Sequence, residues 1–291
     1  MMNKFAIVTD SAGDLCHVMT EELGVHVVPL KFNMQEKEYA DWPDHREMGV
    51  EEFYNLLRAG ERATTAALNA NDYIEAATPI LEAGEDLLIM AFSSGLSTTY
   101  QSSVMAVEEL REKYPERKIY TVDTLGASLG HGLLVWYAAQ QRAQGKSIEE
   151  VRDWQEENKL KLAHWFTVDD LNHLKRGGRV SSATALVGTM LAIKPILHVD
   201  NDGKLISMSK ARGRAASMKA LADKMAETMD TTVEQTVFIS HGDCEEEARK
   251  LGELVKERTG AEVAYISAIG PVVGAHAGPG TLALFFLGCE R

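Results

Sequence analysis

One histidine, His276, stands in a segment whose neighbouring residues would leave an imidazole free to do chemistry. Residues 269–280 read IGPVVGAHAGPG, with four glycines and two prolines around the ring. Glycine and proline on both sides predict a tight, preorganised loop with little side-chain bulk, so a ligand could approach the ring closely. The imidazole could then offer that ligand a hydrogen bond or a proton near neutral pH. The alternative is a turn with an incidental, exposed histidine.

A second segment, 93–103, is rich in hydroxyl groups. Its sequence, SSGLSTTYQSS, places seven serines and threonines in eleven positions. Thr98 and Gln101 have the spacing of a capping box, which predicts a helix start with the hydroxyl of Ser97 just outside it and free. Backbone N–H groups, the positive end of the helix and the hydroxyls would together form a site for a phosphate or a carboxylate. The alternative is that these hydroxyls only cap the helix.

Aspartates close two of the other strand-like runs, at Asp10 and Asp123. The carboxyl ends of parallel strands meet at one edge of a sheet, where ligands bind, so these carboxylates could lie beside the hydroxyl-rich segment. Aspartate is also a favoured helix N-cap, which is the structural alternative. A triad of Ser97, His276 and an aspartate leaves the acid unspecified and is not predicted. His131, among closely spaced glycines, is predicted to be structural.

Two compact basic turns stand out from an acidic chain, KRGGR at 175–179 and KARGR at 210–214. Glycine beside arginine exposes guanidinium groups suited to bidentate contacts with phosphate or carboxylate. Because the net charge is −13, wholesale binding to nucleic acid or to an anionic membrane is disfavoured. The turns therefore predict a surface that meets a partner's phosphates or acidic groups, with a pair of solvated loops as the alternative.

Several other classes of site are absent from the sequence. The chain has no GxxxxGK[ST], no GxGxxG after a strand, no HExxH, no paired CxxC and no GxSxG. It therefore predicts no autonomous nucleotide loop, no metal site and no nucleophile elbow. Three scattered cysteines fit a reducing cytosol. With no signal-peptide pattern and no apolar stretch of roughly 18 residues, we expect a cytoplasmic protein without a membrane span.

Strands and helices alternate in the first half of the chain. The strand-like runs are 5–10, 25–32, 86–92 and 118–122. Helical runs follow three of them, at 14–23, up to residue 114, and at 127–143. This alternation predicts a parallel, doubly wound sheet. Residues 36–71 are less regular and rich in charge, and are expected to cover one face.

The second half is built differently. A charged amphipathic helix at 148–162 is the predicted hinge, and Asp202-Gly203 predicts a hairpin between 195–199 and 204–208. The later elements are expected at 214–229, 237–240, 245–258, 261–267 and 281–287. We therefore predict an α/β protein of two domains with a ligand at their interface. Residues 1–155 would form a Rossmann-like, three-layer α/β/α domain with a parallel sheet, and residues 156–291 a two-layer α/β domain with a mixed sheet.

Six ordered blocks of this chain resemble the DegV family, which includes the fatty-acid-binding subunits of bacterial fatty acid kinase. The blocks are IVTDSAGDL at 7–15, SSGLSTTYQSS at 93–103, VDTLGASLGHG at 122–132, LKRGGRVS at 174–181, IKPIL at 193–197 and GPVVGAHAGPG at 270–280. Together they run from end to end of the chain. The resemblance, rather than the composition, is what names a long-chain fatty acid as the ligand.

The resemblance implies that a threonine, a serine and a histidine hold the carboxylate of the fatty acid. The serine matches Ser97 and the histidine matches His276. The threonine usually opens a TSQPS-like motif, whereas this chain reads ATTAALN at 63–69, so Thr65 is the best match and Thr64 the rival. Ser94 is a possible further contact.

The resemblance also implies a partner. The basic turns match surfaces that engage an ATP-dependent kinase subunit, through Arg176, Arg179 and Arg212. The expected function is then a non-enzymatic carrier, without cofactor or metal, that presents the carboxylate to the kinase for acyl-phosphate formation. One alternative is a small-molecule kinase subunit resembling dihydroxyacetone kinase, with His276 engaging a carbonyl substrate. Another is a regulatory sensor of fatty acid, which would share the same site. An apolar tunnel would favour the carrier, and a small polar cavity would favour the enzyme.

Overall fold

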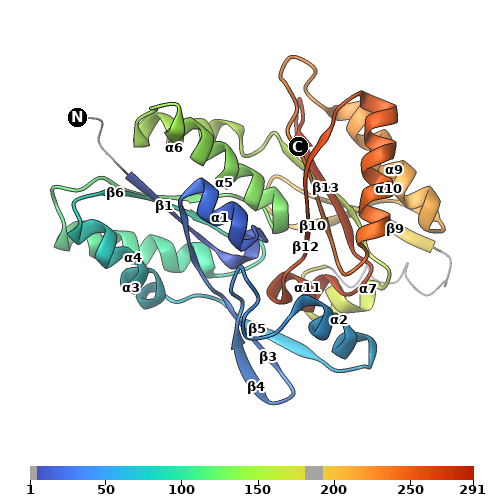
Figure 1. Cartoon of the computed structure of the whole chain (residues 1–291), viewed down its shortest axis with the longest axis horizontal. Helices are drawn as coiled ribbons and strands as arrows, with labels where there is room; N and C mark the ends of the chain where they lie inside the picture. The colour runs from blue at the N-terminus through green and yellow to red at the C-terminus, as the bar shows by residue number, and fades with distance from the viewer. Residues whose placement is uncertain (1–4, 181–192) are drawn as a thin grey trace.

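The computed structural model describes residues 5–180 and 193–291. Ser181, the last residue of the basic block at 174–181, lies outside the described residues. The described residues contain three β-sheets, of four, six and three strands, together with the helices that pack on them. Figure 1 shows the first half of the chain on the left and the second half on the right, with the smallest sheet below both.

The four-stranded sheet is parallel throughout. Its strands, in the spatial order β2-β1-β6-β7, are Val25–Val28, Phe5–Asp10, Asp86–Ala91 and Ile119–Asp123. Both central strands, β1 and β6, are buried along their whole length, as expected for a parallel sheet covered on both faces.

Helices cover both faces of this parallel sheet. On one face lie α3 (Ala70–Glu82) and α4 (Thr99–Lys113). On the other lie α1 (His17–Leu23), α5 (Ser128–Ala143) and α6 (Ile148–Asn158). The predicted α/β/α layering of the first half is therefore confirmed.

The six-stranded sheet is mixed. Its strands, in the order β10-β9-β8-β13-β11-β12, are Leu205–Arg212, Ile193–Val199, Leu162–Thr167, Leu282–Leu287, Val237–His241 and Val263–Ala268. Helices α9 (Arg214–Thr228) and α10 (Glu245–Thr259) pack on one face. The opposite face is turned toward α5. The predicted two-layer mixed sheet and its hairpin between β9 and β10 are both confirmed.

The third sheet corrects two expectations. Residues 36–71 are not an irregular cover, because they contain β4 (Lys37–Ala40), α2 (Val50–Arg58) and β5 (Ala63–Ala66). The run 25–32 is not one strand either. It divides at Pro29-Leu30 into β2 and β3 (Lys31–Met34), where β2 joins the parallel sheet and β3 pairs with β4 and β5. Proline lacks the N–H that a continuous ladder needs, which explains the break.

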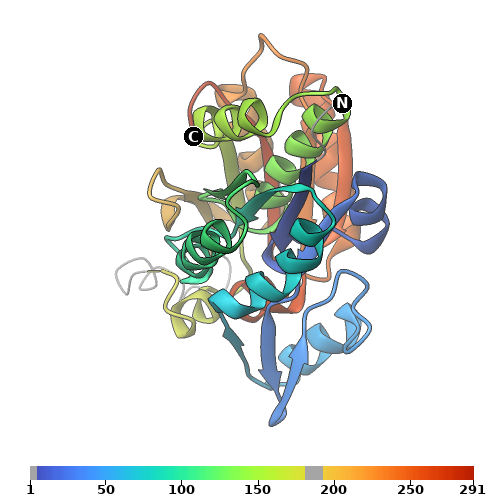
Figure 2. The ribbon, with the colours of Figure 1, turned by 90° about the vertical axis from the view of Figure 1, so that its left-hand side faces the viewer.

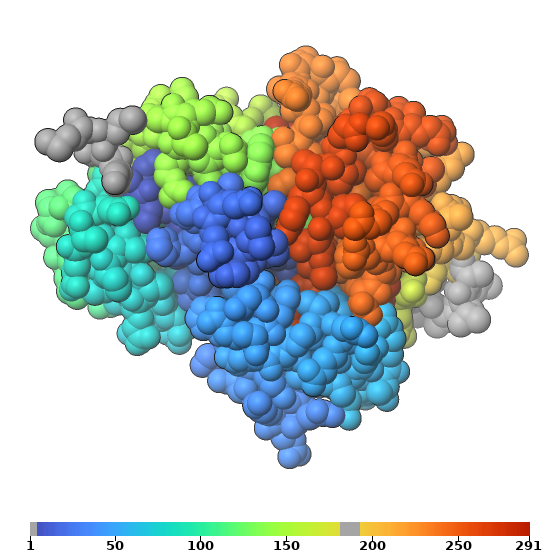
Figure 3. All heavy atoms as spheres, in the orientation of Figure 1, coloured from blue at the N-terminus to red at the C-terminus, as the bar shows by residue number. Residues whose placement is uncertain are grey.

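The small sheet and α2 lie against both halves of the molecule. In Figure 3 the lighter-blue atoms below meet both the left-hand half and the orange right-hand half, and Figure 2 shows the same small sheet projecting downward. Two further short helices complete the described chain, α7 (Leu171–Arg176) and α11 (Pro271–Ala277). A one-turn 3-10 helix, η1 (Ser11–Gly13), follows β1.

Helix α5 lies between the two larger sheets, and glycines let it approach its neighbours. A side chain at Gly132 would come within 3.0 Å of Leu15 Cδ2, and a Cβ at Gly130 would meet Phe285 Cδ1 at 2.7 Å. The absence of a side chain at these glycines therefore allows the close approach of α5. No described helix combines the length and the apolar character that a membrane crossing requires.

Candidate functional site

A cavity of about 410 Å³ lies where the parallel sheet, the six-stranded sheet and α11 meet. Its polar lining includes Thr65, Ser94, Ser97, Arg179 and His276, which come from widely separated parts of the chain. Much of the remaining wall is apolar, and includes Leu30, Phe92, Leu96, Phe166, Val272 and Phe285. The structure thus places the three residues predicted to hold a carboxylate, and Ser94 with them, around one hollow.

Thr65 reaches the cavity from strand β5. Side chains alternate between the two faces of a strand, and in β5 the threonine at 64 is exposed while Thr65 is partly buried against the cavity. The rival residue Thr64 is not part of the described lining. The lining and the different exposure of the two side chains therefore separate two adjacent threonines that the sequence alone left open.

His276 lies on a helix, which corrects the predicted loop. Residues Pro271–Ala277 form α11, with Pro271 at its first position and Gly278 just past its end at φ 81°. Proline fits the first helical position because no N–H is needed there, and glycine tolerates the left-handed conformation after the last turn. The glycines and prolines around His276 thus bound a short helix, and that spacing was a signal available in the sequence.

The imidazole of His276 is held from both sides. Its Nε2 lies 2.8 Å from Thr65 Oγ1. Its Nδ1 has no hydrogen-bond partner among the described residues and packs against Gly177, where a Cβ would overlap it. Since an N–H without an acceptor is costly when buried, the proton belongs on Nε2, which donates to Thr65. The hydroxyl proton of Thr65 then remains available for a ligand.

His276 carries no charge near neutral pH. Burial, reinforced by the positive charge of Arg179, lowers the pKa of His276 to about 4. The ring therefore acts as a neutral hydrogen-bond donor rather than as a cation or a proton acceptor poised near pH 7. No aspartate accepts a hydrogen bond from its Nδ1, so the described residues do not form a Ser97–His276–aspartate triad.

Ser97 stands at the start of α4, but not as the predicted capping box. Thr98 is the N-cap residue and makes no side-chain capping bond. Instead, Ser97 Oγ accepts from the backbone N–H of Thr99 at 3.2 Å and lies 2.8 Å from the Thr99 hydroxyl. The Ser97 hydroxyl is therefore engaged rather than free. When Thr99 donates to it, Ser97 still has its own proton to offer into the cavity.

Arg179 is directed inward, whereas the other two predicted docking arginines are exposed. Its guanidinium donates to the carbonyls of Leu96, at 3.3 Å, and Gly177, and it lines the cavity. Burial lowers the pKa of Arg179, yet it stays a cation because an arginine loses its proton only far above neutral pH. The described lining contains no carboxylate. An anionic ligand would therefore supply the missing counter-charge.

The exposed arginines end a helix and a strand, and neither lines the cavity. Arg176 ends α7 and contacts Nδ1 of His173 at 3.0 Å, and Arg212 ends β10. The two basic turns are thus not equivalent. The turn at 175–179 contributes one arginine to the surface and one to the cavity, because Gly177 brings the backbone directly against His276.

Two buried aspartates that sequence reasoning missed hold the helix that bears His276. Asp14 Oδ1 accepts from the N–H of Gly270 at 2.9 Å, and Asp41 Oδ2 accepts from the N–H of Val272 at 3.2 Å. Both carboxylates thus satisfy free N–H groups at the start of α11. Burial raises the pKa of Asp41 and raises that of Asp14 strongly. Asp14 lies in the block at 7–15, which was the only signal for it.

A hairpin tip from the second sheet fixes the turn before Ser97. Ser93, which is fully buried, donates from Oγ to the carbonyl of Gly203 at 2.9 Å. A Cβ on Gly95 would come within 2.7 Å of the Gly203 backbone. Gly203 itself has φ 72°, which glycine adopts readily. The hairpin predicted from Asp202-Gly203 therefore also positions the hydroxyl-rich segment.

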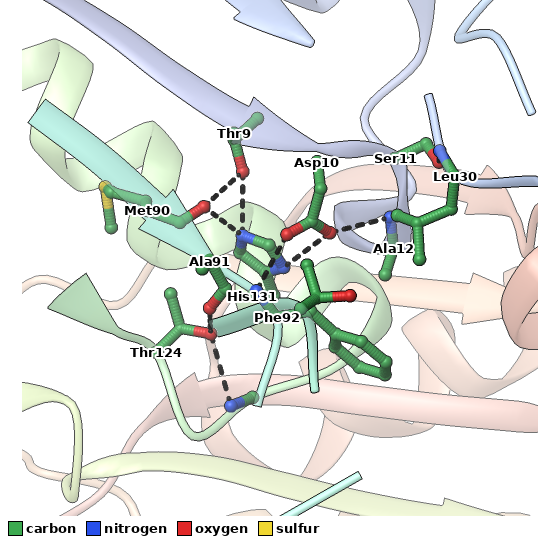
Figure 4. A network of polar contacts seen from close by, with 12 residues as sticks. Thr9, Asp10, Ser11, Ala12, Leu30, Met90, Ala91, Phe92, Thr124 and His131 are labelled. Atoms are coloured by element: carbon green, nitrogen blue, oxygen red, sulfur yellow. Dashed lines mark hydrogen bonds and ion pairs between the residues drawn. The ribbon is translucent and has the colours of Figure 1, made fainter. Parts of the chain in front are cut away.

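The other strand-end carboxylates have structural roles. Asp10 accepts from the N–H groups of Ala12 and Phe92, and Figure 4 shows it beside His131 and Thr9 in a closed network. Asp123 Oδ1 accepts from the N–H groups of Ser94 and Leu125. Neither lines the cavity, and His131 is buried as predicted.

The arrangement suits a ligand with one anionic end and a long apolar body. Hydroxyl donors, a neutral imidazole, a guanidinium and the first turn of the 15-residue helix α4 lie at one end. Phenylalanine, leucine and valine side chains make up much of the remaining wall, which also includes Ser128, His164 and Thr281. The described residues offer no group of three or more histidine, cysteine or acidic side chains that could hold a metal ion.

Comparison with known proteins identifies relatives along the whole chain. The family model described as "Uncharacterised protein, DegV family" matches residues 4–288. A DegV domain-containing protein of Clostridium perfringens is 47% identical over 287 residues, which cover 99% of this chain and 98% of that protein. Another from Streptococcus pyogenes is 35% identical over 284 residues, covering 98% of each chain.

Solved structures of similar fold include proteins described by their ligands. A DegV lipid-binding protein from Thermotoga maritima is 29% identical and superposes with a TM-score of 0.86 over 99% of both chains. A DegV family protein from Thermus thermophilus, described for its fatty acid binding, is 30% identical with a TM-score of 0.86 over 98% of this chain and 99% of that one. DegV from Bacillus subtilis, a fatty acid binding protein, is 29% identical with a TM-score of 0.83, covering 99% of this chain and 100% of its own.

Proposed function

This chain belongs to the DegV family, and we propose that it is a carrier that binds a long-chain fatty acid in its cavity. The carrier presents the carboxylate of the fatty acid to a separate, ATP-dependent kinase subunit, which converts it to an acyl phosphate. The relatives from Thermus thermophilus and Bacillus subtilis are described as fatty acid binding proteins. In this proposal the protein itself is not an enzyme, and catalysis belongs to the partner.

The single observation that carries the proposal is the division of the cavity into a polar end and an apolar body. Burying an acyl chain contributes roughly 0.8 kcal/mol per methylene group, so the tail would supply most of the affinity. A small polar substrate would gain little from a wall that includes Phe92, Phe166 and Phe285. The cavity therefore supports the carrier rather than a subunit that acts on a small carbonyl compound.

We assign the carboxylate to the polar end. Thr65 and Ser97 donate their hydroxyl protons to it, and His276 fixes Thr65 by donating from Nε2. The free N–H groups at the start of α4 and the guanidinium of Arg179 balance its negative charge. Hydrogen bonds to a charged group are each worth roughly 1.5–3 kcal/mol. The exposed side chain of Ser94 lies at the rim as a further contact.

Arg176 and Arg212 form the proposed docking surface for the kinase, because both are exposed and belong to basic turns on an acidic chain. We further propose that the chain divides into domains near residue 155, within α6, the helix that leads from the parallel sheet to β8. A cytoplasmic location is also proposed, since the three cysteines are unpaired and suit a reducing compartment.

Mass spectrometry of the purified protein tests the carrier role directly. We expect the native protein to carry an added mass that is released on denaturation and matches a fatty acid. The substitution Thr65→Val removes a hydroxyl from the polar end, and Thr64→Val is its matched control on the exposed face of the same strand. We expect Thr65→Val to weaken binding of a fluorescent fatty acid about tenfold, and Thr64→Val to leave it unchanged. Equal affinities in both variants would contradict the proposed carboxylate site.

The partner role needs a second experiment. Arg176→Ala combined with Arg212→Ala should lower the rate of acyl-phosphate formation by a cognate kinase, while the fatty acid stays bound. Lys250→Ala combined with Lys256→Ala, at two exposed lysines of α10, serves as the charge-matched control. The rate is measured with the kinase below saturation. Loss of lipid from the double variant, or an unchanged rate of acyl-phosphate formation, would argue against docking through these arginines.

A further inference from the structure

The cavity has a far end that can be located from the strand register. Strands β8 and β13 run side by side, with Thr167 opposite Leu282, Phe166 opposite Ala283 and His164 opposite Phe285. The C-terminal end of β8 leads into α7 and Gly177, which packs against His276. Residues 164 and 285 are therefore about three residues, or roughly 10 Å, farther from the polar end than residue 167.

Two aromatic rings close that end. His164 and Phe285 line the cavity and contact each other edge to face, with ring centroids 5.3 Å apart. His164 Nδ1 donates to the carbonyl of Leu162 at 3.0 Å, which fixes the ring. Burial lowers the pKa of His164 well below its ordinary value, so the ring stays neutral and suits an apolar wall.

Gly130 of helix α5 determines how far from the polar end of the cavity the two rings lie. A Cβ on Gly130 would overlap Nε2 of His164 and come within 2.7 Å of Phe285 Cδ1. Behind the rings the structure is solid. Leu162 and Leu287, the next residues on the same faces of β8 and β13, belong to the core and do not line the cavity. The rings of His164 and Phe285 therefore cannot move toward Leu162 and Leu287, and any displacement brings them into the cavity.

From this geometry we propose that the His164–Phe285 pair, seated on Gly130, is the end wall that sets the upper limit of acyl chain length. The inference rests on the proposed fatty acid function and assigns its specificity. A chain of the right length ends against the two rings. A longer chain must displace side chains from a close-packed core, which is costly.

The test is a competition among straight-chain saturated fatty acids from lauric to arachidic acid, with the bound species identified by mass spectrometry after denaturation. Phe285→Leu removes three side-chain carbons from the wall. We expect the longest well-retained acid to lengthen by about two to three carbons. Phe286→Leu is the matched control, since the adjacent residue is equally buried but faces α9 and α10 on the other side of the sheet. We expect it to leave the length distribution unchanged.

The substitution Gly130→Ala tests the same wall in the opposite direction. The added methyl group pushes both rings toward the cavity, so the longest well-retained acid should shorten by about one to two carbons. Circular dichroism and a thermal melt of each variant establish that it is folded. If Gly130→Ala does not fold, Phe285→Leu against Phe286→Leu still decides the question.

The outcomes separate the two proposals. If the native protein retains no fatty acid at all, the carrier function itself fails. If it retains fatty acids but Phe285→Leu and Phe286→Leu show the same length distribution as the native protein, the end wall fails while the carrier function stands. A lengthening caused equally by both phenylalanine variants would also overturn the end wall, because it would reflect general loosening of the core.

Discussion

Two threonine–histidine pairs among the described residues have the same oxygen–nitrogen distance and different surroundings. Thr9 Oγ1 lies 2.8 Å from His131 Nε2, and Thr65 Oγ1 lies 2.8 Å from His276 Nε2. Both histidines have glycines close by in the sequence. The Thr9 hydroxyl donates a hydrogen bond to the carbonyl of Met90 at 2.9 Å, so the protein itself supplies the acceptor and this pair is closed. Thr65 has no further acceptor among the described residues.

The difference shows where a ligand can be recognised. In the closed pair, burial lowers the pKa of His131 while the neighbouring Asp10 opposes this effect. In the open pair, burial and Arg179 act in the same direction on His276. A carboxylate is thus already present beside His131, whereas the cavity beside His276 holds a cation without one. The same hydrogen bond stabilises the fold in one place and leaves a donor for a ligand in the other.

The largest expected effect separates the two pairs by stability. His131 is fully buried, so His131→Ala leaves a cavity and unpaired polar groups, and should lower the free energy of unfolding by about 3 kcal/mol. His276→Ala removes a ring from the wall of an existing cavity and should cost about 1 kcal/mol or less. Urea denaturation monitored by circular dichroism measures both. Equal losses would show that the pairs do not differ in this way.

The second prediction concerns the unmatched cation. Arg179→Gln keeps polar atoms near the cavity but removes the positive charge, so fatty acid affinity should fall about tenfold or more because the carboxylate loses its charged partner. Arg176→Gln, a nearby exposed arginine, is the control. Titration with a fluorescent fatty acid provides the measurement. The charge has no role in binding if the two variants bind equally well.

The third prediction uses the pKa of His276. Folded His276 takes up a proton only near pH 4, whereas a histidine in the unfolded chain does so near about pH 6.5. Between these values the unfolded state binds more protons, so the free energy of unfolding falls as pH drops through this window. From about pH 7 to about pH 5, this residue should cost the native protein roughly 1–2 kcal/mol.

The variant His276→Gln isolates that contribution. It lacks the titrating group but keeps the other buried histidines, including His198, whose pKa burial lowers to about 4. The free energy of unfolding should therefore fall less steeply with acidification in the variant than in the native protein. Urea denaturation at several pH values measures the free energy of unfolding of both proteins. If it changes with pH equally in the two, His276 is exposed rather than buried.

The smallest expected effect tests the hairpin contact near the open pair. Ser93→Ala removes the donor to Gly203 and should lower the free energy of unfolding by about 1 kcal/mol. Because the contact also positions the turn before Ser97, fatty acid affinity should fall two- to threefold, about 0.5 kcal/mol. Ser209→Ala, at an exposed serine of β10, is the control. A loss of stability with unchanged affinity would limit Ser93 to a structural role.

Local sequence patterns predicted much of the fold because the relevant interactions are local. Apolar runs at 5–10 and 86–92 are buried parallel strands, and Asp202-Gly203 forms the hairpin turn. The segment around His276 was predicted wrongly. Its glycines and prolines predict a loop, whereas Pro271 begins a helix and Gly278 follows its last residue. The region 36–71 was also missed. Its strand β4 is only four residues long, and β5 pairs with β3, from which β4 and α2 separate it in the sequence.

The candidate site could be predicted only in part. The sequence by itself determined that a hydroxyl-rich helix start, an isolated histidine and two basic segments exist, because residue type and spacing carry that information. Only the tertiary structure decided that Thr65 rather than Thr64 faces His276, which is 211 residues away, that Arg179 turns inward, and that Asp14 and Asp41 hold α11. Burial, desolvation and the pairing of polar groups depend on contacts between segments far apart in the chain, and no local pattern specifies them.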